Sequence, residues 1–89
     1  MHVKRKQKKL LDRVSRIRGQ VDAIHRAIEK EEECARVLNV MAACRGAMTS
    51  LMSEVLEEHV MTHVADEADA KQRQEAAEEI IAVLRSYVR

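Results

Sequence analysis

The chain has 89 residues, of which 46% are hydrophobic and 35% charged, and its formal net charge is +1. This length fits one small domain, residues 1–89, whose thin core favours oligomerisation. Two cysteines exclude a disulfide framework, and no apolar segment is long enough to span a membrane or to form a signal peptide. We expect a cytoplasmic protein. With no Gly-rich loop, paired acid/base carboxylates or nucleophile constellation, we expect no enzyme.

The first predicted helix covers residues 3–29. Apolar residues recur there at alternating spacings of four and three, the seam of an antiparallel bundle or coiled coil: Leu10, Val14, Ile17, Val21, Ile24 and Ile28. The pattern stops in the charged run at residues 29–33, where we place a turn.

A second helix is predicted from residue 32 or 33 to residue 64. Its seam consists of Val37, Met41, Cys44, Met48, Met52 and Val55. About thirty helical residues span about 45 Å, which exceeds the roughly 13 Å radius of gyration of a compact domain of about 100 residues. The excess length indicates a partner helix from another copy.

A polar, acidic connector is predicted at residues 65–74, followed by a short third helix at residues 75–88. The fold class is therefore all-α, with two long antiparallel helices and a short third one in each protomer. Gly19 and Gly46 lie nearly level across the predicted hairpin, which favours close backbone approach. Two unrelated, tolerated glycines are the alternative.

Cys34, His59 and His63 are residues of the types that bind metals. On a helix, His59 and His63 leave the same face one turn apart. Cys34 precedes His59 by 25 residues, on the order of 37 Å along one helix, so its thiolate has to come from another copy.

A two-fold axis near Met48 brings these residues together. If two second helices pack antiparallel about that axis, Cys34 of one subunit lies level with His59 and His63 of the other, and symmetry creates two such sites. The hairpin adds His2 from the start of the chain. A single histidine on an apolar seam is usually a hydrogen-bonded interface residue, and a single buried cysteine usually behaves as a small hydrophobic residue. The convergence of all four residues favours a metal site.

A basic stripe lies along one side of the first predicted helix. Residues 4–18 carry eight Lys or Arg against Asp12 alone, and four of them share that side: Arg5, Lys9, Arg13 and Arg16. A solvated charged face is the plain alternative. Because countercharge is scarce, we expect duplex DNA as the partner, bound through its phosphates. A single aromatic residue argues against a single-strand binder that stacks bases.

Several motifs together resemble the CsoR/RcnR family of bacterial repressors. They are residues 13–20 (RVSRIRGQ), the Glu33-Cys34 pair, residues 43–47 (ACRGA), residues 51–55 (LMSEV) and His59-x-x-x-His63. The resemblance covers essentially the whole chain. It implies an all-helical protein whose dimers form four-helix bundles and assemble as a dimer of dimers. Such a homotetramer binds operator DNA and releases it when an effector binds.

The branches of that family differ at the effector positions. Copper sensors of the CsoR type carry Cys, His and Cys where this chain has Cys34, His59 and His63, and formaldehyde sensors of the FrmR type lack the second histidine. Nickel and cobalt sensors of the RcnR type carry His, Cys, His and His, which His2, Cys34, His59 and His63 match. The resemblance thus implies a repressor responsive to Ni(II) or Co(II) that controls metal efflux or resistance. Zn(II) or Cu(I), a formaldehyde sensor using Cys34 and the N-terminus, and a helical scaffold without effector remain alternatives.

Overall fold

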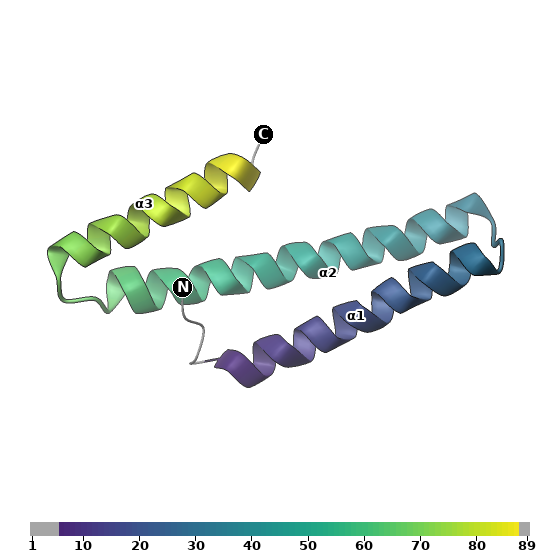
Figure 1. Ribbon diagram of the computed structural model, residues 1–89, viewed down its shortest axis with the longest axis horizontal. Helices are drawn as coiled ribbons and strands as arrows, with labels where there is room; N and C mark the ends of the chain where they lie inside the picture. Colours follow the sequence, from purple (N-terminus) through teal and green to yellow (C-terminus); the bar gives the residue numbers. More distant parts are fainter. Residues whose placement is uncertain (1–5, 88–89) are drawn as a thin grey trace. The chain divides into compact units, whose positions relative to one another are not determined.

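The structure, a computed structural model, describes residues 6–87, which form helices and no strands (Figure 1). In chain order these are α1 (Gln7–Glu29), α2 (Cys34–Val60), a π-helical turn η2 (Met61–Ala65) and α3 (Ala70–Tyr87). The all-α class with two long helices and a shorter third is confirmed. None of the helices described is long and apolar enough to cross a lipid bilayer.

The chain divides into two compact units. One is the helical hairpin Gln7–Ser53, and the other, among the described residues, contains Lys6 and residues 54–87. The single domain expected over residues 1–89 stays a prediction. In the hairpin, α1 ends at Glu29 as predicted, while residues 3–5 of its expected start lie outside the described part. The second helix begins at Cys34, one or two residues later than expected.

The turn between α1 and α2 is closed by backbone hydrogen bonds. The N–H of Glu32 donates to the carbonyl of Ala27 at 3.1 Å, and the N–H of Glu31 donates to that of Ile28 at 3.1 Å. Together these two bonds form a Schellman motif, which places the residue after the helix end in the left-handed region. Glu31 occupies that position with a φ of 53°. The chain therefore turns without glycine or proline, which explains why the sequence marks this boundary so faintly.

The apolar stripe of α1 is half buried and half exposed in a single chain. Of the predicted seam, Leu10 and Ile17 are buried, whereas Val14, Val21 and Ile28 expose 37%, 51% and 58% of their surface. Three large apolar residues of α2 within the hairpin are also exposed, namely Leu38, Met41 and Met48. A two-helix hairpin thus leaves part of its predicted seam without a covering element in the described chain.

The predicted close approach of the two glycines is wrong. A Cβ atom added at Gly19 or at Gly46 meets no atom within 4 Å. Gly19 follows the buried Ile17 by two positions, so it leaves α1 about 200° away from that side chain. The glycines therefore lie on open surface of the protomer.

Within the second unit, the helix geometry changes from α to π at Met61. The N–H of Asp66 donates to the carbonyl of Met61 at 3.0 Å, the five-residue spacing of a π-helix. The expected end of the second helix, residue 64, falls inside this turn. The connector then extends only to Asp69, so the predicted start of the third helix at residue 75 is wrong by five residues.

Asp69 caps α3. Its Oδ1 accepts hydrogen bonds from the N–H groups of Lys71 and Gln72 at 2.8 and 3.2 Å. Arg73 lies near the start of α3, and its side chain extends toward the connector. Its Nη1 donates hydrogen bonds to the carbonyls of Glu67 and Ala68 at 3.0 and 3.2 Å. These bonds satisfy otherwise orphaned backbone groups and fix the connector, which allows α3 to pack against η2.

Candidate metal centre

Two histidines lie side by side where α2 passes into η2. His59 is the penultimate residue of α2, and His63 belongs to the π-helical turn. Their ring centroids are 4.9 Å apart and the ring planes are tilted by 47°. Because a π-turn holds more residues than an α-turn, side chains four positions apart stay near one another on one side of the helix. The predicted pairing of the two imidazoles is therefore present within one chain.

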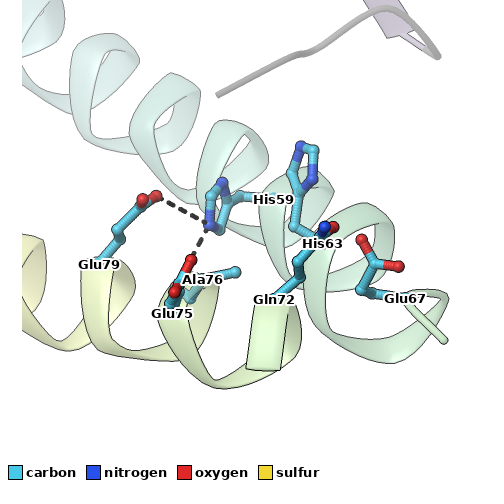
Figure 2. Close-up of a pocket in the computed structure, with 7 residues that line it drawn as sticks. All are labelled: His59, His63, Glu67, Gln72, Glu75, Ala76 and Glu79. Carbon is cyan, nitrogen blue, oxygen red and sulfur yellow. Dashed lines mark hydrogen bonds and ion pairs between the residues drawn. The ribbon is translucent and has the colours of Figure 1, made fainter. Parts of the chain in front are cut away.

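The His59 imidazole is buried, with 4% of the residue exposed. Its Nε2 lies 3.4 Å from the carbonyl oxygen of Ala76 and 3.9 Å from Oε2 of Glu79, both on α3 (Figure 2). Its Nδ1 is also buried and has no hydrogen-bond partner among residues 6–87. Buried polar atoms are nearly always paired. An unpartnered ring nitrogen with the other nitrogen held by a carbonyl is the arrangement of a metal-binding histidine.

A hollow of about 300 Å³ lies beside the two imidazoles, between η2 and α3. Carboxylates and one amide make up most of the rest of its wall (Figure 2), and the lining residues are His59, His63, Glu67, Gln72, Glu75, Ala76 and Glu79. Carboxylate oxygens and imidazole nitrogens favour a cation over an anion at this place.

A buried carboxylate adjoins the histidines in the sequence. Glu58 is 3% exposed, and its Oε1 accepts a hydrogen bond from Oγ1 of Thr62 at 3.1 Å. A buried carboxylate is costly unless it is hydrogen-bonded. The donor one turn further along the helix lowers that cost.

The other two predicted ligands are not gathered here. Cys34 is the first residue of α2 and is exposed, 25 helical positions before His59 on the same helix. His2 lies outside the described residues. Within residues 6–87, no three His, Cys, Asp or Glu side chains are placed to hold a metal ion together.

Three of the four predicted DNA-binding residues lie on α1. Lys9 and Arg16 are exposed, Arg13 is half-buried, and Arg5 lies outside the described residues. The guanidinium of Arg13 donates through Nη2 to the hydroxyl of Ser50 on α2. A hydrogen bond to Ser50 thus links the stripe to the second helix, and the sequence pattern did not single out this serine.

Sequence reasoning also missed the α3 side of the histidine site. Ala76, Glu79 and Gln72 were assigned to a connector or to an unremarkable short helix. The spacing Asp69-x-x-Gln72 was the available signal, because an Asp followed three residues later by Gln is a helix-start pattern. A helix starting at residue 70 places Ala76 and Glu79 one turn apart on the same face.

Comparison with known proteins identifies a family whose model matches the chain. The model of a family described as "Metal-sensitive transcriptional repressor" matches residues 6–86. The chain is 40% identical over 88 residues to the transcriptional repressor RcnR of Salmonella typhimurium, covering 99% of this chain and 98% of that protein. It is 49% identical over 89 residues to a Serratia marcescens protein described as uncharacterized in the bioA 5' region, with coverage of 99% and 98%.

Two solved structures share the fold. A variant of the formaldehyde-responsive regulator FrmR from Salmonella enterica serovar Typhimurium is 44% identical, with a TM-score of 0.87 and coverage of 99% of this chain and 100% of that one. The copper-sensing repressor CsoR with Cu(I) from Geobacillus thermodenitrificans is 21% identical, with a TM-score of 0.88 and coverage of 100% and 93%. The second likeness concerns the fold alone.

Proposed function

Since this chain belongs to the family of metal-sensitive transcriptional repressors, whose members are repressors and not enzymes, we propose that it represses transcription of metal efflux or resistance genes. The apo protein binds operator DNA in the cytoplasm and releases it when Ni(II) or Co(II) binds. The observation that carries this proposal is the buried, unpartnered Nδ1 of His59 beside the ring of His63.

The residues present fit such a metal. His59, His63 and Cys34, with His2 from the N-terminal segment, supply three imidazoles and one thiolate, a donor set suited to borderline divalent ions. When bound, the ion supplies a fixed positive charge that ties these groups together. The carbonyl of Ala76 and the carboxylate of Glu79 orient the His59 ring from its other nitrogen.

The thiolate is supplied by a second copy. Cys34 and His59 stand at opposite ends of α2, so antiparallel packing of two α2 helices about an axis near Met48 pairs each cysteine with its partner's histidines. The exposed apolar residues of the hairpin support this dimer, because Val21, Ile28, Met41 and Met48 become covered in a four-helix bundle. Two such dimers form the homotetramer.

DNA binding is assigned to the basic stripe Arg5, Lys9, Arg13 and Arg16. Lysine and arginine along one helix neutralise phosphates and release counterions. Several copies in a tetramer present the stripe to one duplex, so backbone contacts and DNA shape contribute more than an inserted recognition helix. Release requires that the effector bind the DNA-free state more tightly, and a coupling of roughly 1–3 kcal/mol is ordinary.

The test is Cys34→Ala against Cys44→Ala. We expect Cys34→Ala to bind duplex DNA as the wild type does when metal is absent, and to keep hold of it when Ni(II) or Co(II) is added. Cys44 is a half-buried cysteine on the same helix, ten positions away, and its alanine variant should respond to metal normally. Release of DNA by Cys34→Ala at the wild-type metal concentration contradicts the ligand assignment.

A formaldehyde-responsive repressor is the second candidate. The exposed thiol of Cys34 and the 44% identity to the FrmR variant favour it. In that case Cys34 and the N-terminal amine react with the aldehyde. Titration of the DNA-bound protein with Ni(II), Co(II), Zn(II), Cu(I) and, under chelator, formaldehyde separates the candidates, because each predicts release by a different reagent.

A further inference from the structure

The Ser50 side chain of α2 forms a direct hydrogen bond with a residue of the predicted DNA-binding stripe. Its hydroxyl accepts a hydrogen bond from Nη2 of Arg13, within the unit Gln7–Ser53. An arginine side chain on a helix surface samples many rotamers, and a hydrogen bond to a hydroxyl of the neighbouring helix reduces their number before any ligand binds. The bond therefore places one guanidinium of the stripe in a defined position over the edge of α2.

A surface hollow of about 330 Å³ opens next to this guanidinium, between α1 and α2. It is lined by Arg13, Arg16, Ile17, Gln20 and Ala47. The planar guanidinium group of arginine matches the oxygen geometry of a phosphate group, and Ile17 and Ala47 form an apolar part of the wall. The hollow thus combines two guanidinium groups with an apolar side.

The Gln20 amide adds a third polar group. Its Oε1 is buried and has no hydrogen-bond partner within residues 6–87. Rotation of the amide by 180° exchanges this oxygen with the NH₂ group, which supplies two donors at the same place. After this rotation the NH₂ group of Gln20 takes the place of the unpartnered oxygen, and a phosphate oxygen can accept a hydrogen bond from it.

Resting on the DNA binding proposed above, we propose that this hollow seats one phosphate of the DNA backbone and that Ser50 is a positioning residue that holds Arg13 toward it. Arg13 and Arg16 contact the phosphate oxygens, and the Gln20 amide donates from the wall. The phosphate site is therefore built by both helices of the hairpin, and its geometry depends on how α1 lies against α2.

The experiment uses full-length protein and a labelled duplex selected by the wild type from a random pool, with anisotropy titrations at several salt concentrations. We expect Ser50→Ala to weaken binding about three- to tenfold, the effect of losing one hydrogen bond. Ser50→Thr keeps the hydroxyl and should restore wild-type affinity. Ser53→Ala, an exposed serine on the same helix, should bind as the wild type does.

A double-mutant cycle separates positioning from a general structural effect. Arg13→Gln should weaken binding and lower the slope of log affinity against log salt by about one. Ser50→Ala added to Arg13→Gln should cause no further loss, because its only action is through Arg13. An equal loss in both backgrounds overturns the proposal, as does unchanged binding by Ser50→Ala.

Two further outcomes are decisive. If the wild type selects no duplex, the proposed function fails and the phosphate site with it, whereas selection followed by wild-type affinity of Ser50→Ala refutes the phosphate site alone. Inorganic phosphate at constant ionic strength should not displace the duplex better than chloride does. Displacement from the wild type but not from Arg13→Gln identifies a site for free phosphate and overturns the proposal for DNA.

Discussion

His59 and Glu79 face each other from α2 and α3, with Nε2 of the buried imidazole 3.9 Å from Oε2 of the exposed carboxylate. The carbonyl of Ala76 approaches the same nitrogen at 3.4 Å. These two oxygens favour the tautomer with the proton on Nε2, which leaves the Nδ1 lone pair available. In the proposed metal site, the third helix would therefore leave Nδ1 as the His59 nitrogen that binds the ion.

Glu79→Gln should weaken metal binding by about tenfold, because the outer partner of a metal-binding histidine raises the basicity of the ring. Apo DNA binding should be unchanged. The measurement is a competition titration with a metal-binding dye. Glu78→Gln makes the same charge change one position earlier, outside the residues that line the hollow, and should bind metal as the wild type does. Equal weakening in both variants would indicate only a general charge effect.

Met48→Glu should dissociate the dimer. Met48 is exposed in the single chain and lies near the proposed two-fold axis, so the two introduced carboxylates come close together in the assembled protein. Burial of unpaired like charges should raise the dimer Kd by about two orders of magnitude. Sedimentation velocity measures the change, and Thr49→Glu, exposed on the next position around the helix, is the matched control.

Glu31→Gly should stabilise the fold. Glu31 holds a φ of 53°, which costs an L-residue roughly 1–2 kcal/mol and costs glycine little. We expect the free energy of unfolding to rise by about 1 kcal/mol in urea titrations of the metal-free protein. Glu32→Gly, next to it and outside the left-handed region, should give no such gain. A loss of stability in Glu31→Gly would contradict the Schellman turn.

Asp69→Ala should lower the free energy of unfolding by about 1 kcal/mol, because two N–H groups at the start of α3 lose their acceptor. Since α3 carries Ala76 and Glu79, metal affinity should fall as well. Asp69→Asn and Asp69→Ser keep a capping oxygen and should recover most of both losses. Thermal unfolding followed by circular dichroism, together with the dye competition, checks the two effects.

The sequence predicted the parts of the fold that depend on local periodicity. The end of α1 at Glu29 and the start of α2 near Cys34 follow from the seam spacing and from its lapse between them. The start of α3 was misplaced because its first turns are polar and carry no apolar spacing. Capping by Asp69, and not burial, begins that helix.

The histidine pair was predictable and its surroundings were not. His59 and His63 lie four positions apart in the sequence, so any helical geometry brings them together. The contacts of His59 with Ala76 and Glu79 join residues 17 and 20 positions apart on different helices. Neither these contacts nor the π-turn closed by Asp66 and Met61 has a signature in apolar spacing. The intersubunit role of Cys34 stays a prediction.

The placement of Cys34 and His59 at the two ends of α2 has a genetic consequence. If the proposed intersubunit centre is right, a chain with Cys34→Ala and a chain with His59→Ala should each lose metal binding alone, whereas a mixed pair should draw the thiol from one parent and both imidazoles from the other. One of the two proposed centres of the mixed pair should then have its full set of ligands. Co-expression should therefore restore half of the wild-type metal content to the hybrid, a rescue that a centre confined to one polypeptide forbids.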